Sequence, residues 1–553
     1  MRTIMKNKYH LLLTLAALLA ALALSACSSG SAGLQPQQTQ TGEDAADTGR
    51  VLTVVEDEPD TVDFQCTSIY YTVALNVFDR LVETEVDDGG TMRIVPALAE
   101  SWTVSDDGCG YTFRLREGVT FSNGSPLTSS DVLYTLTRLL TDPDACNQDI
   151  IREISGAPQL EDGETDRLEG FAILNDREFV ITLAQPFEPF LSCLAMPAAS
   201  ILDQETMEAI GESFGTDPAC TIGTGPYILQ SWEPGKGMLL TRNPIFWDSP
   251  PPNDGLDFRF ITEAEEQRLM FEDGELDILD LDNLGDTAEY FFHGDIYQDR
   301  LCEAQQIGIN YIALNESVKP LDDVRVRKAL QLSLDRQMLL DAVYSGRGSL
   351  ENGILPLGLK GFNPDLPEIP YDPETAAQLL AEAGYPDGFD LTVGVKSSST
   401  LWERELISMA ASMWEDIGVR TSIEVMDESE FMDLRKSGAL PCYTARWDAD
   451  YNDPDNFLYT FFGSRENTTF RSLCYPREDV MLRVRQARSI SDEAARMQEY
   501  QALEQTIIQE DAAWIPLFSR THYYVAGDRV DEIKTSWNGW VSISYRDIAV
   551  NEG

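Results

Sequence analysis

The stretch from 96 to 140 constrains the fold most strongly, because strand signals and a helix signal follow one another within it. TVSDDG is typical of a strand entering a turn and YTFRLREG of a second strand, so the pair predicts a β-hairpin. After a further turn at SNGSP, Ser129, Ser130 or Asp131 is expected to cap a helix. Four apolar residues give that helix one buried side: Val132, Leu133, Leu136 and Leu140. We therefore expect a mixed α/β fold.

The chain is also too long for one ordinary hydrophobic core. Its 553 residues predict two or three folded lobes. An apolar fraction of 43% gives these lobes enough side chains to bury, which argues against global disorder.

The N-terminus predicts export. A basic start is followed by an uncharged apolar run over 11–24, which is too short for a comfortable membrane-spanning helix and typical of an export signal. The sequence LSAC that ends at Cys27 resembles the lipobox of bacterial lipoproteins. This resemblance implies that residues 1–26 are removed and that Cys27 carries the lipid. The alternative is an ordinary secretory signal with a chance cysteine.

The segment 27–49 is rich in Ser, Gly, Gln and Thr, and it predicts a flexible tether. Outside the cytoplasm the remaining cysteines are permitted to form disulfides, but the sequence leaves their pairing open. No two of them form a CxxC pair, so a structural zinc site is not expected. They are Cys66, Cys109, Cys146, Cys193, Cys220, Cys302, Cys442 and Cys474.

Charge and composition exclude several classes of function. A formal net charge of −52 repels nucleic acid and anionic lipid headgroups, so neither is an expected partner. Beyond the signal only His293 and His522 remain, too few for an HExxH or a three-histidine zinc site. A GxxxxGK[ST] phosphate-binding motif does not occur. We expect no catalytic residues, no metal and no cofactor, and the distant alternative is a secreted hydrolase that uses a carboxylate pair.

Seven motifs occur along the chain in the order that one family uses. The block LAESWTVSDDGCGYTFRLREGVTFSNGSPLTSSDV resembles the signature of solute-binding proteins of the peptide/nickel class, which serve ABC importers. GTGPYILQSWEPG, RNPIFW and FEDGELDI are similar to its central strands and a following turn. YIALNESVKPLDDVRVRKALQLSLDRQMLLDAVYSGRG, YDPETAAQLLAEAGYPDGF and AAWIPLF complete the series. In the second of these, Asp372 is expected to cap a helix that starts with Pro373 and ends at Gly384. The resemblance covers nearly all of 50–553.

The resemblance implies a bilobed periplasmic-binding-protein-like clamp of the large type. Lobe I is expected to comprise 50–305 plus 516–553, with an extra subdomain at about 80–195, and lobe II 306–515. Two segments cross between the lobes and act as a hinge, so closure traps a solute at the interface.

The acidic stretch RWDADYNDPDNFL admits three interpretations: a calcium loop, a turn or a ligand socket. Asp448, Asp450 and Asn452 match the first three ligand positions of an EF-hand loop. Asp453 stands where that loop needs glycine and Tyr459 where it needs a bidentate glutamate, which argues against calcium.

Asp453 and Asp455, which flank a proline, are interpreted as turn residues. Trp447 and Asp450 match a W-x-x-D arrangement that lies in lobe II of peptide-binding family members. The resemblance implies that the aspartate accepts the α-ammonium of a peptide and that the tryptophan lines the adjoining pocket, with a cation–π contact over its indole. Asp450 is expected to stay ionised. Neighbours with a weaker claim to ligand contact are Tyr451, Asn452 and Arg446.

The resemblance thus implies a lipid-anchored, non-enzymatic receptor on the outer face of the cell membrane. It is expected to be a monomer that captures peptides and delivers them to an ABC permease with its ATPases. No motif identifies the cation for a peptide carboxylate, although Arg446 and Arg404 are candidates. The alternative keeps the fold and changes the solute to a nickel chelate or an oligosaccharide.

Overall fold

The computed structural model of the chain describes residues 50–86, 92–294, 296–539 and 542–551, which lie within one compact unit, Gly49–Gly553. The predicted signal, the lipid site Cys27 and the tether up to residue 49 lie outside the described residues. None of the described helices has the length and apolar character needed to cross a membrane.

One large sheet runs through the described part of the chain. Its main path is β16-β15-β17-β13-β18-β11-β1-β10-β9-β8, and β12 and β14 also pair with β18. The bounds in chain order are β1 Val51–Val55, β8 Tyr227–Glu233, β9 Gly237–Arg242, β10 Gly255–Arg259, β11 Ile278–Asp280, β12 Leu301–Gln305, β13 Gly308–Leu314, β14 Gly348–Leu350, β15 Asp390–Lys396, β16 Arg420–Met426, β17 Cys442–Asp448 and β18 Trp514–Ala526.

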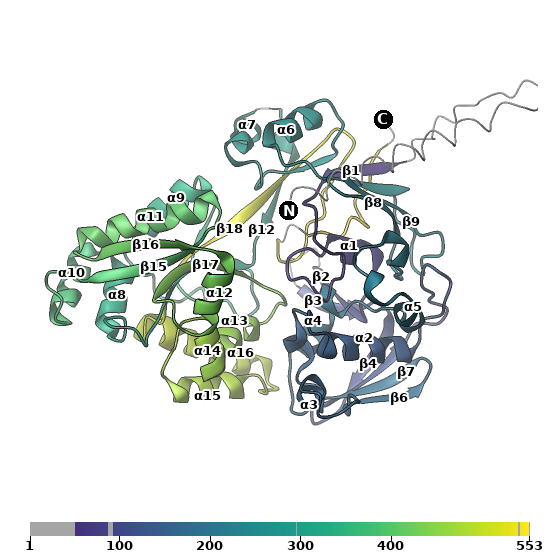
Figure 1. Ribbon diagram of the computed structural model, residues 1–553, viewed down its shortest axis with the longest axis horizontal. Helices are drawn as coiled ribbons and strands as arrows, with labels where there is room; N and C mark the ends of the chain where they lie inside the picture. Colours follow the sequence, from purple (N-terminus) through teal and green to yellow (C-terminus); the bar gives the residue numbers. More distant parts are fainter. Residues whose placement is uncertain (1–49, 87–91, 295, 540–541, 552–553) are drawn as a thin grey trace, which may run out of the picture. The chain divides into compact units, whose positions relative to one another are not determined.

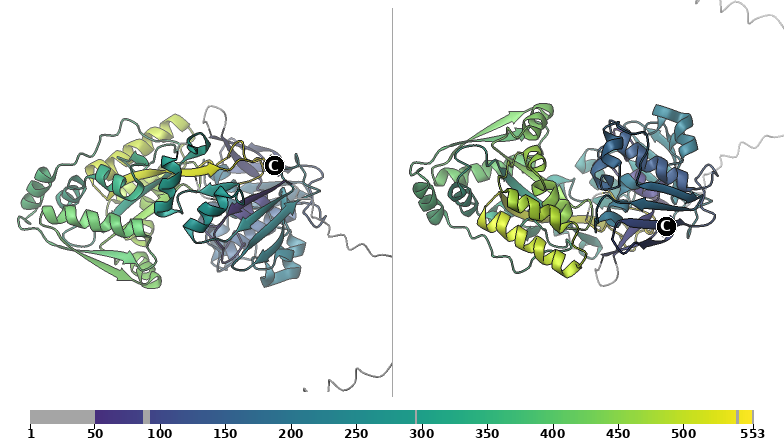
Figure 2. Two further views of the ribbon diagram at one scale, coloured as in Figure 1. Left: turned by 90° about the horizontal axis from the view of Figure 1, so that it is seen from above. Right: turned by 90° about the horizontal axis from the view of Figure 1, so that it is seen from below.

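Strand β18 connects the two halves of this sheet. It runs antiparallel to β13 near its start, with Ile515 opposite Ile312, and antiparallel to β11 near its end, with Tyr524 opposite Asp280. In Figure 1, β18 is the long yellow strand in the middle of the view. In Figure 2, the blue segments lie on one side of this strand and the green segments on the other. A single continuous strand therefore carries the backbone from one half of the clamp into the other.

The hairpin and helix expected at 96–140 are confirmed. Strands β4 and β5 pair antiparallel with Trp102 opposite Phe113. Helix α2 follows, but its cap is Thr128, whose backbone N–H donates to the Asp131 carboxylate at 2.7 Å. The cap lies before the predicted serines because Asp131 takes the third helical position of a capping box. The two small sheets are β4-β5-β7-β6 and β2-β3, with bounds β2 Val82–Val86, β3 Met92–Pro96, β4 Ala99–Val104, β5 Gly110–Leu115, β6 Phe171–Asn175 and β7 Glu178–Thr182.

The helix expected after Asp372 is confirmed in detail. Helix α10 spans Pro373–Glu382, the Asp372 carboxylate accepts the N–H of Thr375 at 2.9 Å, and Gly384 ends the turn with φ +97°. The other helices are α1 Thr72–Val77, α2 Ser129–Thr141, α3 Ala157–Glu161, α4 Phe190–Leu194, α5 Gln204–Ile210, α6 Ala264–Glu272, α7 Glu289–His293, α8 Val324–Leu332, α9 Arg336–Tyr344, α11 Leu401–Asp416, α12 Glu428–Lys436, α13 Asp455–Phe462, α14 Arg465–Phe470, α15 Glu478–Ala487 and α16 Glu493–Glu504.

The buried residues form separate cores. Two cores draw on residues between 307 and 518, and one draws on residues between 81 and 201 together with Tyr451. A further core combines residues from 52 to 304 with residues from 524 to 550. The lobe boundaries near 305 and 516 remain a prediction, and lobe I and lobe II denote the predicted ranges.

Candidate functional site

A large cavity with a volume of about 750 Å³ lies next to the acidic loop. Lobe I supplies most of its wall through β2, β3, β12 and the segment 533–547, and lobe II contributes Asp450. Its volume falls within the range of roughly 300–1,000 Å³ that is usual for ligand sites. Six carboxylates and three cations line it among the described residues: Asp79, Glu83, Glu85, Glu303, Asp450 and Asp547, and Arg80, Lys534 and Arg546.

Asp450 is held in the cavity wall by its own loop, between β17 and α13. Its backbone N–H donates to Asn456 Oδ1 at 3.0 Å, and Asn456 Nδ2 donates to Asp450 Oδ2 at 2.9 Å. The preceding residue, Ala449, donates to the carbonyl of Ile307 at 2.8 Å and accepts from Asn538 Nδ2 at 2.9 Å. These hydrogen bonds fix the position of the Asp450 carboxylate. Among the described residues, no cationic side chain lies within ion-pair distance of it.

Desolvation raises the pKa of Asp450 to about 7. The hydrogen bond from Asn456 and the charge of Arg471 lower this pKa, and the charge of Asp149 raises it. The expectation that Asp450 stays ionised is therefore met only in part, since about half of the unliganded molecules carry the proton at pH 7. A bound cation would favour the ionised form.

Trp447 lies next to this site but is not among the residues that line the cavity. Its ring meets Phe461 edge-on at 5.4 Å between centroids, and the Arg471 guanidinium lies over the indole at 4.5 Å. Arg471 thus lies over the ring at the place where a ligand ammonium was expected to make a cation–π contact. Trp447 supports the position of Arg471.

The three weaker candidates for ligand contact, Tyr451, Asn452 and Arg446, make contacts within the protein. Tyr451 is buried in the core that draws mainly on residues between 81 and 201, and its hydroxyl donates to Asp455 at 3.1 Å. Asn452 accepts the backbone N–H of Lys360 at 2.8 Å. Arg446 Nε donates to Asp448 Oδ2 at 2.9 Å, so its charge is neutralised within the strand end.

Asp453 and Asp455 are more than turn residues. Asp453 forms a buried ion pair with Arg496, and Asp455 accepts from Arg488 Nε at 2.9 Å. Arg488 also reaches Glu153 of lobe I at 2.6 Å. The turn interpretation missed these pairs because the arginines lie more than thirty residues further along the chain.

Sequence reasoning also missed Arg471. Arg404, which was predicted as a candidate cation for a peptide carboxylate, is exposed on α11 and donates to the carbonyls of Ser397 and Ser399 instead. Arg471 follows α14 by one residue and reaches Trp447 only through the fold. No local pattern around TTFRSLC indicates that Arg471 covers the indole of Trp447.

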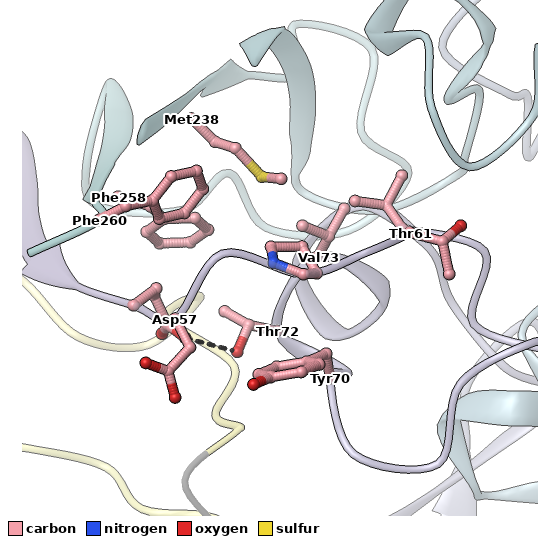
Figure 3. Close-up of a pocket in the computed structure, with 11 residues that line it drawn as sticks. Asp57, Thr61, Tyr70, Thr72, Val73, Met238, Phe258 and Phe260 are labelled. Carbon is pink, nitrogen blue, oxygen red and sulfur yellow. Dashed lines mark hydrogen bonds between the residues drawn. The ribbon is translucent and has the colours of Figure 1, made fainter. Parts of the chain in front are cut away.

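A second pocket is too small for a peptide. It has a volume of about 20 Å³ and lies between residues of β9 and β10 and the segment 56–73 (Figure 3). The Thr72 hydroxyl donates to Glu56 at 3.1 Å, and burial raises the pKa of Glu56 to about 8. Burial thus favours the protonated form of Glu56 at neutral pH, and one water molecule would fill the pocket.

Two clusters have residue types that bind metals, but an arginine occupies each. Arg138 pairs with Asp63 at 2.5 Å and with Asp142 at 2.9 Å beside Cys66. In the second cluster His522 lies between Asp280 and Asp282, and Arg520 pairs with Asp282 at 2.9 Å. Because the arginines neutralise these carboxylates, we assign no metal there. The cysteines of the described residues are free thiols.

Comparison with known proteins supplies the family context. The family profile described as "Bacterial extracellular solute-binding proteins, family 5 Middle" matches residues 93–469. The dipeptide-binding protein of Escherichia coli is 28% identical over 480 residues, covering 81% of this chain and 84% of the relative. Heme-binding protein A of Haemophilus influenzae is also 28% identical, over 468 residues, covering 81% and 82%.

Solved structures share the fold. An oligopeptide-binding protein of Borrelia burgdorferi (OppAIV) matches with a TM-score of 0.76 at 24% identity, covering 91% of this chain and 100% of the other. DppA of Helicobacter pylori in complex with the peptide STSA matches with a TM-score of 0.73 at 23% identity, covering 91% and 98%. At such identities these structures show the bilobed α/β fold alone.

Proposed function

This chain belongs to the bacterial extracellular solute-binding proteins of family 5, and from that premise we propose that it captures peptides and delivers them to an ABC permease with its ATPases. The observation that carries the peptide assignment is Asp450, a fixed carboxylate in the wall of a 750 Å³ cavity with no cationic partner among the described residues. Every peptide with a free N-terminus brings an ammonium group. A carboxylate at this place recognises the class of ligand and not its side chains.

The chemistry fits a moderate affinity. A charge-assisted hydrogen bond contributes about 1.5–3 kcal/mol. Micromolar binding needs about 8 kcal/mol. The remainder comes from hydrogen bonds to the extended peptide backbone and from apolar contact within the cavity. These terms depend little on sequence, as expected for a receptor of broad specificity.

We place the protein outside the cell, anchored by lipid on Cys27, and acting as a monomer without catalysis. The LSAC sequence at the end of the apolar run supports the anchor. Two or more acyl chains on one residue give stable membrane attachment, since each buried methylene contributes about 0.8 kcal/mol.

Calorimetry on the soluble body, residues 28–553, tests the proposal. Peptides of two to eight residues with free N-termini should bind, whereas N-acetylated versions, glycans and nickel should not. Asp450→Asn should weaken peptide binding by about tenfold or more, the loss of one charge-assisted bond. Asp547→Asn is the matched control, because this carboxylate lines the same cavity elsewhere.

Equal affinity for free and acetylated peptides would show that Asp450 does not bind the peptide ammonium. Binding of a glycan or a nickel chelate in preference to any peptide would replace the peptide assignment by the alternative solute, because the fold alone does not select the ligand.

A further inference from the structure

Arg488 joins the two predicted lobes outside the ligand cavity. It follows the last residue of α15 in lobe II, and only 6% of its side chain is exposed. Its Nη1 donates to the carboxylate of Glu153 in lobe I at 2.6 Å, and its Nε donates to Asp455 of lobe II at 2.9 Å. None of these three residues belongs to the described wall of the 750 Å³ cavity. The group therefore links protein segments and leaves the ligand surface free.

Aromatic rings from both lobes also contact the Arg488 guanidinium. It lies over the ring of Tyr459 in α13 at 3.7 Å and over the ring of Phe187 in lobe I at 4.5 Å. A planar guanidinium can stack on aromatic faces while its edge donates hydrogen bonds. One side chain of lobe II thus makes both an ionic and an aromatic contact with lobe I.

The side chain of Glu153 is held in place by its own lobe. Gln185 Nε2 donates to Glu153 Oε2 at 3.1 Å, and the backbone N–H of Ala184 donates to the Glu153 carbonyl at 2.8 Å. The other carboxylate oxygen, Oε1, accepts from Arg488. Lobe I therefore presents an oriented carboxylate to the guanidinium.

Lobe II neutralises Arg488 without help from Glu153. Asp455 is 0% exposed and supplies one negative charge to the guanidinium, and the hydroxyl of Tyr500 donates to Asp455 at 3.2 Å. A buried ion pair with further hydrogen bonds of this kind meets the needs of both charges. Glu153 is a second carboxylate and comes from the other lobe. We therefore expect Glu153 to contribute to the association of the lobes and not to the folding of lobe II.

The acidic loop carries both the candidate ligand carboxylate and the partner of Arg488. Tyr451 follows Asp450 in this loop and is buried in the core that draws mainly on residues between 81 and 201. Its hydroxyl donates to Asp455 at 3.1 Å. Separation of the lobes would break the contacts of Tyr451 and Arg488 with lobe I, and it would take Asp450 away from the rest of the cavity wall.

We propose that Arg488 is a latch between the lobes, which binds Glu153 and Phe187 of lobe I while Asp455 holds it in lobe II. A contact that exists only when the lobes are together shifts the conformational equilibrium toward the closed clamp. The latch touches no ligand, so it slows the release of every ligand trapped in the cavity by the same factor. This inference goes beyond the proposed function, and only the use of peptides as probes rests on that function.

Dissociation kinetics of a captured peptide test the latch. Surface plasmon resonance on the immobilised soluble body, residues 28–553, gives the association and dissociation rate constants of Ala-Ala-Ala. Glu153→Gln should raise the dissociation rate constant by about fivefold, because a neutral amide weakens a charge-assisted hydrogen bond. The association rate constant should stay within about twofold, since changes in affinity fall mainly on dissociation. Glu153→Lys places a like charge opposite Arg488 and should raise the dissociation rate constant further.

A neighbouring ion pair provides the matched control. Glu161 pairs with Arg152, the residue before Glu153, and both belong to lobe I. Glu161→Gln therefore removes a similar charge without touching lobe II, and its dissociation rate constant should stay within about 1.5-fold of the parent. Melting temperatures of all variants within about 2 °C of the parent exclude a folding defect.

A second peptide separates a latch from a ligand contact. Ala-Ala-Ala and Ala-Ala-Ala-NH₂ differ in the charge of the tail. Because the latch touches neither, Glu153→Gln should raise both dissociation rate constants by the same factor, to within about 1.5-fold. A factor that differs clearly between the two peptides would mean that Glu153 acts on the ligand, and the latch would be wrong.

Small-angle X-ray scattering examines the same contact without a ligand. The unliganded Glu153→Lys protein should have a larger radius of gyration than the parent, because its lobes separate more often. The Glu161→Gln protein should match the parent.

The outcomes distinguish this inference from the proposed function. If Ala-Ala-Ala binds and Glu153→Gln leaves its dissociation rate constant unchanged, the latch is wrong and peptide capture stands. If neither peptide binds the parent, the proposed function is wrong, and the scattering decides on the latch by itself. An unchanged radius of gyration in Glu153→Lys would then overturn the latch as well.

Discussion

The raised pKa of Asp450 predicts that peptide binding releases protons. In the unliganded protein this pKa is about 7, because burial disfavours the charged carboxylate. The bound ammonium requires the ionised form, so at pH 7 about half a proton leaves for each peptide bound. The peptide amine, with a pKa of about 7.7–8.0, takes up about 0.1 proton at this pH. The expected net release is about 0.4 proton.

The same values predict the pH dependence of the affinity. A proton that leaves on binding means that the affinity rises with pH, and the ionised fraction of Asp450 falls from about 0.5 at pH 7 to about 0.1 at pH 6. The Kd should therefore increase about fivefold over that unit and about tenfold over the next one down to pH 5. Above pH 8 the amine loses its proton and binding weakens again.

Calorimetry in buffers with different ionisation enthalpies measures the released protons directly. The parent protein should show the release at pH 7, and Asp450→Asn should show only the small uptake by the amine. Asp547→Asn should behave like the parent. A variant at 450 that still releases protons would mean that another group titrates on binding, and the assignment of the pKa to ligand capture would be wrong.

Three further predictions concern the framework of the site. Burial lowers the pKa of His522, but the charges of Asp280 at 2.9 Å and of Asp282 outweigh it, so the folded pKa is raised. The stabilising effect of His522 should be full below the unfolded pKa of about 6.5 and be lost as the pH rises through the higher folded pKa. His522→Asn should therefore flatten the pH dependence of the unfolding free energy in that window, as chemical denaturation measures. Arg488→Ala leaves buried Asp455 without its cation and should destabilise the protein by about 3–5 kcal/mol in urea unfolding. Asp372→Ala removes the cap of α10 and should cost about 1 kcal/mol in the same assay.

Controls for these predictions use the same elements. Arg483→Ala on α15 removes a partly exposed ion pair with Glu499 and should cost no more than about 1 kcal/mol. If Arg488→Ala costs as little as Arg483→Ala, the buried ion pairs do not stabilise the fold to the expected extent. A pH dependence that survives His522→Asn would assign the titration to another group.

Sequence reasoning predicted the elements whose signals are local. The helix after Asp372 has its cap, its first-position proline and its terminal glycine within thirteen residues, and all three act as predicted. The hairpin at 99–115 follows from alternation and a turn. Even there the cap of α2 was missed by one residue, because Thr128 and Asp131 satisfy each other across the first turn.

The charge pairs could not be predicted, because they join distant segments. Asp455 and Arg488 are 33 residues apart, and Arg488 and Glu153 are 335 residues apart. The acidic loop was correctly recognised as unusual, yet its spacing does not say which carboxylates are buried with arginines and which face a cavity. Of the four carboxylates in this loop only Asp450 lines the cavity, and its position depends on its hydrogen bonds with Asn456.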